Sequence, residues 1–195
     1  MELRSWKRSE FMSNIAEFLK LAGKLKKIER TGWVTRVGIE NPESVSDHSF
    51  RTALIAMIVG DMKKIDSNKL MRMLLIHDLG ESLIGDFDIF AKKKIGENIW
   101  KEKEKRAVHE ILFENLPKNV AEDYYNLWVE FDEHKTELAK LAHEIDKLEV
   151  LLQAVDYEKS GYDKNKLEIF WKISNPLVKD SHLRDILEAY KIRVS

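Results

Sequence analysis

The chain contains no cysteine, only three prolines and only eight glycines among 195 residues. The absence of cysteine excludes disulfides, thiolate nucleophiles and cysteine-ligated zinc, and it fits a reducing cytoplasm. The scarcity of proline and glycine favours long helices joined by few tight turns. Because 44% of the residues are hydrophobic and 34% are charged, the chain has enough apolar side chains for a core of its own.

The chain also lacks a charge imbalance and a long apolar run. Its net charge is −1, so no overall field attracts nucleic acid or an anionic membrane. The longest apolar run, around Ala53–Val59, is too short to cross a bilayer, and the first eleven residues contain no apolar signal core. We therefore expect a cytoplasmic protein with no nucleic-acid or membrane partner, built as one domain over residues 1–195.

Apolar residues recur at helical spacing along most of the chain. No segment shows the alternation of a useful strand, so the fold is expected to be all-α. The segment 30–36 is expected to be a loop, and the charged segment 92–106 a mobile or solvated stretch that leads into a helix. Helices are predicted to begin near Phe11, at Ser44 or Ser46, at Asp66 or Ser67, at Pro117 and at Thr136, with shorter ones at 165–173 and 180–192.

Four imidazole or carboxylate side chains lie at or beside the apolar faces of these helices: His48, His77, Asp78 and Asp146. Such groups are costly in a core unless something pairs with them, and no lysine or arginine lies one helical turn from Asp78. A single divalent metal ion would pair with all four. Imidazole and carboxylate ligands suit Mn²⁺, Co²⁺, Fe²⁺, Ni²⁺ or Zn²⁺, with Mg²⁺ as a further candidate.

A catalytic metal also needs open positions for a water and a substrate oxygen. Two histidines and two aspartates leave such positions on a six-coordinate ion, which can acidify the water and neutralise charge on a phosphoryl group. Glu81 lies one helical turn after His77 and can relay a proton. Asp86 is the alternative relay, or it can orient the water or a sugar hydroxyl.

The order His48, His77-Asp78, Asp146 resembles that of the HD-domain metal-dependent phosphohydrolases. Four strings around these residues are similar to the 5′-deoxynucleotidase branch, which includes YfbR-like and HD domain-containing protein 2-like enzymes. They are RTGWVTR at 30–36, PESVSDHS at 42–49, HDLGESLIGD at 77–86 and EIDKLE at 144–149. The resemblance covers about residues 10–160 and implies an HD-domain helical bundle, usually a homodimer, with helices of 162–195 packing on it.

The resemblance also implies an activity, which is hydrolysis of a (deoxy)nucleoside 5′-monophosphate to the nucleoside and phosphate. Glu81 matches an essential carboxylate of the family, and Asp86 matches a second acid that contacts the sugar. Trp33 matches a substrate contact, and Arg30 or Arg36 matches the arginine that accompanies it. The residues that match the family's metal ligands are His48, His77, Asp78 and Asp146.

Two other interpretations stay open from the sequence. The same site can act on cyclic or polyphosphorylated nucleotides, as a phosphodiesterase or pyrophosphohydrolase does. Alternatively, the chain is a non-catalytic helical interaction module whose metal is structural or absent. In that case His77 and Asp78 form a hydrogen-bonded pair, and Trp33 only packs against a helix.

Overall fold

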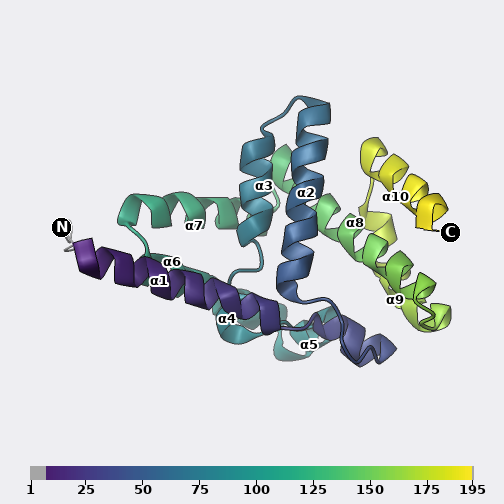
Figure 1. Cartoon of the computed structure of the whole chain (residues 1–195), viewed down its shortest axis with the longest axis horizontal. Coiled ribbons are helices and arrows are strands. Elements are labelled where there is room, and N and C mark those ends of the chain that lie inside the picture. Colours follow the sequence, from purple (N-terminus) through teal and green to yellow (C-terminus); the bar gives the residue numbers. More distant parts are fainter. Residues whose placement is uncertain (1–7, 195) are drawn as a thin grey trace.

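The computed structural model describes residues 8–194, which form helices joined by short connections (Figure 1). Within this range the only β pairing is an isolated bridge between Glu29 and Ser44, so the all-α expectation is confirmed. The elements are α1 (Arg8–Gly23), η1 (Lys24–Lys27), η2 (Trp33–Val37), α2 (Val45–Lys63), α3 (Ser67–Ile76), α4 (Glu81–Ile84), α5 (Ile89–Ile95), α6 (Glu97–Asn115), α7 (Lys118–Glu133), α8 (Glu137–Lys159), α9 (Lys164–Ser174), η3 (Asn175–Leu177) and α10 (Ser181–Val194).

Short polar side chains cap the helices that carry the site. Ser44 begins α2 with a capping box, because its hydroxyl accepts from the Asp47 N–H while the Asp47 carboxylate accepts from the Ser44 N–H. Asp66 caps α3 and Thr136 caps α8 in a similar way. Each such cap stabilises a helix by about 1 kcal/mol. Of the two candidate caps for each of these helices, the structure therefore shows Ser44 for α2 and Asp66 for α3.

One expectation about local structure is wrong, and a second is right only in part. The segment expected to be a loop contains the π-helical turn η2, because Gly32 has a right-handed helical conformation and the chain turns only at Gly38, where φ is 83°. The segment 92–106 is mostly exposed, as expected, but it is helical almost throughout, with one break at Gly96. Its few apolar residues suffice because Trp100 is buried in the molecule, and tertiary packing can outweigh a weak local pattern.

Helix α8 lies at the centre of the fold and buries residues on most of its circumference. One core cluster joins it to α2, α3 and α10, and another joins it to η2 and α9. A third cluster lies between α1, α6 and α7. In Figure 1, α2 crosses the molecule in front of α8, and α9 and α10 lie at the C-terminal end. None of the helices in residues 8–194 is long and apolar enough to span a bilayer.

Candidate metal centre

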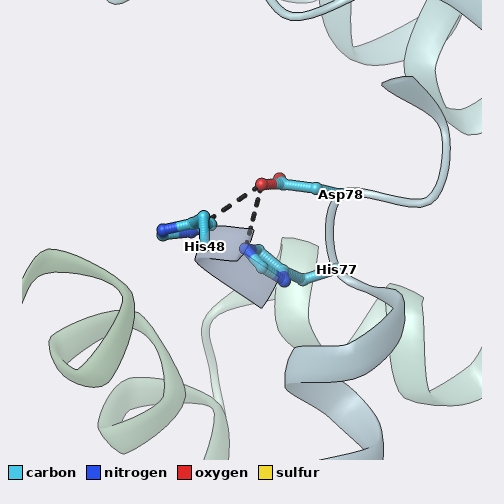
Figure 2. A group of neighbouring side chains, drawn as sticks. All are labelled: His48, His77 and Asp78. Atoms are coloured by element: carbon cyan, nitrogen blue, oxygen red, sulfur yellow. Dashed lines mark ion pairs between the residues drawn. The ribbon is translucent and has the colours of Figure 1, made fainter. Parts of the chain in front are cut away.

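The structure brings His48, His77 and Asp78 together in one group, and Asp146 adjoins it through His48. His48 lies in the first turn of α2, His77 and Asp78 follow the end of α3, and Asp146 lies in the middle of α8. The Nε2 atom of His77 is 3.1 Å from Oδ2 of Asp78, and the Nε2 atom of His48 is 3.8 Å from the same oxygen. His48 Nε2 is also 3.1 Å from Oδ1 of Asp146. Figure 2 shows both imidazole rings directed toward the Asp78 carboxylate.

The hydrogen bonds of the two rings leave their Nε2 atoms available. His77 Nδ1 donates to the carbonyl oxygen of Leu74 at 2.7 Å, and His48 Nδ1 is hydrogen-bonded to the carboxylate of Glu149. Both Nε2 atoms are buried and make no hydrogen bond within the described residues. Metal-ligating histidines typically donate their second ring N–H to a carboxylate or carbonyl in this manner.

The spacing of these atoms fits a single ion. Ligands bound at about 2.1 Å and 90–109° apart lie about 3.0–3.4 Å from one another. The observed separations of 3.1 and 3.8 Å are close to that range. His48, His77 and Asp78 therefore form a group that could hold a divalent metal ion.

The carboxylates of this cluster are held in their charged form. Burial raises the pKa of Asp78, but the charges of His77 and Arg30 outweigh it and keep that pKa well below the usual range. Burial also opposes ionisation of Asp146, yet Lys147 and His48 hold its pKa well below the usual range. Two anionic oxygens are thus directed at the two imidazoles, as a cation site requires.

In the absence of a bound cation, the neighbours of His48 favour the positively charged form of its imidazole, with a proton on both ring nitrogens. Burial and the charge of Arg30 lower its pKa, but the carboxylates of Glu149 and Asp146 outweigh them and raise it to about 10. A metal ion at Nε2 would replace this proton, because metals bind the neutral imidazole.

Glu81 lies beside the cluster in a setting that favours its neutral form. Its side chain is buried, and neither carboxyl oxygen makes a hydrogen bond within the described residues. Burial and the negative charges of Asp78 and Asp86 raise the pKa of Glu81 well above its ordinary value. The nearest cation is Lys92, whose Nζ is 3.8 Å from Glu81 Oε1. A buried acid whose pKa is raised in this way is suited to take up and give back a proton.

The two arginines of the 30–36 segment occupy different places. Arg30 Nη1 is 3.1 Å from Asp78 Oδ2 and 3.7 Å from Asp86 Oδ1, so it lies against the cluster. Arg36 pairs with Asp88 at 2.9 Å and lies over the ring of Phe90 at the rim. The structure thus places Arg30, rather than Arg36, beside the candidate ligands.

Trp33 is part of the wall of the same pocket but is almost fully buried, with 2% of its surface exposed. Its ring stacks on Phe170 at a centroid distance of 3.9 Å, and Nε1 donates to Glu43 Oε1 at 2.8 Å. Trp33 therefore both packs in the core and lines the pocket.

The cluster opens into a pocket of about 390 Å³. The lining includes polar residues, among them Arg30, Asp86 and Lys92, and apolar residues. The apolar residues come partly from the C-terminal helices and include Ile173 and Leu177. This volume is within the range of small-ligand sites, and the mixed lining suits a ligand with both charged and apolar parts.

Sequence reasoning missed the residues behind His48. Glu149 is fully buried, and its Oε1 accepts a hydrogen bond from Arg51 Nε at 2.8 Å. Arg51 also donates to Asp156 at 2.7 Å. The spacing of three residues between Asp146 and Glu149, and between His48 and Arg51, places each partner on nearly the same helix face as a predicted ligand. That spacing was the available indication.

Comparison with known proteins agrees with this arrangement. The sequence model of the HD domain matches residues 22–185. The chain is 42% identical over 188 residues to the protein named 5′-deoxynucleotidase HDDC2 of Dictyostelium discoideum, covering 89% of this chain and 97% of that one. It is 34% identical over 161 residues to the human protein of that name, covering 81% and 75% of the two chains.

Solved structures show the same fold. A conserved hypothetical protein from Pyrococcus furiosus superposes with a TM-score of 0.73 at 34% identity, covering 91% of this chain and 99% of that chain. A helical bundle whose histidines and aspartates converge in this order defines an HD-type domain. The chain belongs to the HD-domain family.

Proposed function

We propose that this protein is a metal-dependent phosphomonoesterase that hydrolyses deoxynucleoside 5′-monophosphates to the deoxynucleoside and phosphate. The observation that carries the proposal is the convergence of two buried, unbonded Nε2 atoms and the Asp78 carboxylate in a pocket that also contains Arg30 and Glu81. The naming of relatives at 31–42% identity as 5′-deoxynucleotidases supports the choice of substrate.

In this proposal His48, His77, Asp78 and Asp146 hold one divalent ion of the Mn²⁺, Co²⁺, Ni²⁺, Fe²⁺, Zn²⁺ or Mg²⁺ type. When bound, such an ion lowers the pKa of a water and neutralises charge on a phosphate oxygen. Glu149 and the Leu74 carbonyl fix the orientation of the two rings, so that both Nε2 lone pairs face the same point.

The remaining residues position the substrate and move protons. Arg30 binds the phosphate, for which a planar guanidinium is suited. Water attacks phosphorus, the bond to the 5′-oxygen breaks, and Glu81 transfers a proton between the water and that leaving oxygen. Asp86 lines the pocket, where it accepts from the Thr31 N–H and can meet the sugar. Trp33 and the apolar residues of α9 bound the nucleoside end.

A substrate panel tests this function. Purified protein with Mn²⁺ or Co²⁺ is assayed for phosphate release from deoxynucleoside and ribonucleoside monophosphates, cyclic nucleotides and nucleoside triphosphates. We expect release from deoxynucleoside monophosphates. Activity only on cyclic or polyphosphorylated nucleotides would overturn the choice of substrate, and activity on none would support the interaction module.

The Glu81→Ala variant provides a second test. We expect it to lose turnover by about 100-fold or more while it keeps its fold and its metal content, since general acid–base groups contribute 10²–10⁴-fold. Glu114→Ala, at an exposed position of α6, is the matched control and should keep full activity. Equal activity of the two variants would contradict the role of Glu81.

We further infer that the protein acts in the cytoplasm as a homodimer. The HD-domain resemblance supports the dimer, and the absence of cysteine supports a reducing compartment.

A further inference from the structure

The three consecutive lysines of α5 differ in their surroundings. Lys93 and Lys94 are exposed to solvent, which is the usual place for a lysine side chain. Lys92 instead lines the pocket of the candidate metal centre, and only 29% of its side chain is exposed. The pocket therefore contains a lysine to which the proposed reaction has so far given no role.

The position of Lys92 is fixed by the way in which α5 is anchored. Asp88 caps α5 by accepting from the N–H groups of Phe90 and Ala91, and the other oxygen of its carboxylate pairs with Arg36 of η2. Helix α5 also packs on α6 (Figure 1). The backbone N–H of Lys92 donates to the carbonyl oxygen of Asp88 at 3.0 Å, so Lys92 lies one helical turn from this anchor.

The ammonium group of Lys92 has attractive neighbours but makes no hydrogen bond within residues 8–194. Its Nζ atom lies 5.3 Å from the centre of the buried Trp100 ring, which is a cation–π contact. Glu81 Oε1 is 3.8 Å from the same Nζ, which is too far for a hydrogen bond. Because an ammonium group can donate three hydrogen bonds, Lys92 has donors available for an anionic ligand that enters the pocket.

Lys92 also keeps its positive charge in this place. Burial lowers the pKa of Lys92, but the negative charges of Glu81 and Glu104 outweigh it and raise that pKa. A second cation, Arg30, pairs with Asp78. The Glu81 N–H donates to the Asp78 carbonyl oxygen at 3.0 Å, so these two acids belong to one turn of the chain. Two cations from different segments thus lie beside the same turn.

We propose that Lys92 is a second phosphate-binding residue, which donates to one non-bridging oxygen of the substrate phosphate while Arg30 holds another. This inference rests on the proposed function and adds a residue to it. A phosphate group carries about −1.5 to −2 charges at neutral pH, which is more than one guanidinium neutralises. Lysine binds such a group as a point charge. When the phosphate occupies the ammonium group, the Glu81 carboxyl group is released for proton transfer.

Binding of inorganic phosphate tests the proposal without turnover. Phosphate is titrated calorimetrically into Mn²⁺-loaded protein. Lys92→Met keeps an apolar stem against Trp100 but removes the charge, so the fold and the circular dichroism spectrum should be unchanged. We expect its Kd for phosphate to rise about 10–100-fold, as for the loss of a hydrogen bond between charged groups. Lys93→Met, at the exposed neighbour, is the matched control and should bind phosphate as the wild type does.

Two results of this titration would overturn the proposal. One is an equal Kd for phosphate in Lys92→Met and Lys93→Met. The other is a Mn²⁺-loaded wild-type protein that does not bind phosphate at all. Neither result depends on hydrolysis. Failure of the proposed function would be seen separately, as wild-type protein that releases no phosphate from any monophosphate.

A Glu81→Gln background separates direct phosphate contact from an effect that passes through Glu81. In that background the carboxylate beside Lys92 is gone, so a lysine that only positions Glu81 has nothing left to act on. We expect Lys92→Met to raise the Kd for phosphate by the same factor in Glu81→Gln as in the wild type, since the two changes then act independently. No further loss of phosphate binding in the double variant would overturn the direct contact.

Steady-state kinetics give an independent readout. A contact made both in the bound substrate and in the transition state raises KM more than it lowers kcat. Because the phosphate group is common to both substrates, Lys92→Met should raise KM for p-nitrophenyl phosphate by the same factor as for a deoxynucleoside monophosphate. A loss confined to kcat would overturn the phosphate contact and make Lys92 a positioning residue for Glu81.

Discussion

The guanidinium of Arg30 lies 3.1 Å from the carboxylate of Asp78, although 48 positions separate them in the chain. This ion pair supplies the cation that is missing from the helical neighbourhood of Asp78. The same guanidinium lies 3.7 Å from Asp86, so one positive charge lies beside two carboxylates of the pocket. It also fixes the segment before η2 against the turn that follows α3.

Replacement of Arg30 therefore tests the phosphate-binding role. We expect Arg30→Ala to lower kcat/KM for a deoxynucleoside monophosphate by about 100-fold, since it removes a charge-assisted contact to phosphate. Arg36→Ala, at the rim, should lower it by less than about 10-fold. Steady-state kinetics of the two variants show which of the two arginines contacts the phosphate. A larger loss of kcat/KM in Arg36→Ala than in Arg30→Ala would show that Arg36, and not Arg30, contacts the phosphate.

The hydrogen bond from His48 to Glu149 predicts a dependence of metal affinity on a residue that does not touch the metal. We expect Glu149→Gln to weaken binding of Mn²⁺ by about 10–100-fold, because the carboxylate orients the ring and raises its basicity. Calorimetric titration of the metal-free protein measures this effect. The control is Glu158→Gln. Glu158 lies on the same helix, and one-third of its side-chain surface is exposed to solvent. Equal affinities in the two variants would contradict the role of Glu149.

The four candidate ligands could be singled out in the sequence because each is a polar group set in an apolar helical pattern. The helices themselves followed from the same periodicity and from the caps at Ser44, Asp66 and Thr136. What periodicity cannot give is the path of the chain between helices. The contact of Arg30 with Asp78 therefore required the structure.

The apolar wall of the pocket was missed for a related reason. Ile173 and Leu177 lie beyond the part of the chain that carries the resemblance, Ile173 at the end of an expected helix and Leu177 between two expected helices. Only the packing of α9 and η3 against α8 brings them to the pocket. Glu149 was overlooked because a glutamate on a long helix is usually solvated, whereas here it is fully buried.

The apolar wall leads to a prediction about specificity. We expect Leu177→Asp to raise KM for deoxynucleoside monophosphates by about 10-fold, which corresponds to about 1.4 kcal/mol of lost apolar contact. Hydrolysis of p-nitrophenyl phosphate, which lacks a nucleoside, should change much less. Because Leu177 is 47% exposed, the fold should be unaffected. Equal effects on both substrates would argue that this residue does not contact the nucleoside.

Glu43 predicts a pH dependence of stability. Burial and the negative charge of Glu149 raise the pKa of Glu43 from 4.5 to about 7. Between pH 4.5 and 7 the folded state therefore keeps a proton that the unfolded state releases, so this group makes the protein less stable as pH rises through that window. Above pH 7 the effect is constant.

Glu43→Gln removes this titration and keeps an acceptor for the Trp33 N–H. Relative to wild type, its free energy of unfolding should rise between pH 4.5 and 7 by up to about 3 kcal/mol, at 1.36 kcal/mol per pKa unit. Urea titrations of metal-free protein at several pH values measure the difference. Glu40→Gln, at an exposed site, is the control. A difference that is flat across this window would contradict the raised pKa of Glu43.

The most direct test of the central claim is a crystal structure with Mn²⁺ and its anomalous difference map. The account predicts one strong peak about 2.0–2.3 Å from the Nε2 atoms of His48 and His77 and from a carboxylate oxygen each of Asp78 and Asp146. A map with no peak among these four side chains, or with its strongest peak elsewhere in the molecule, would contradict it.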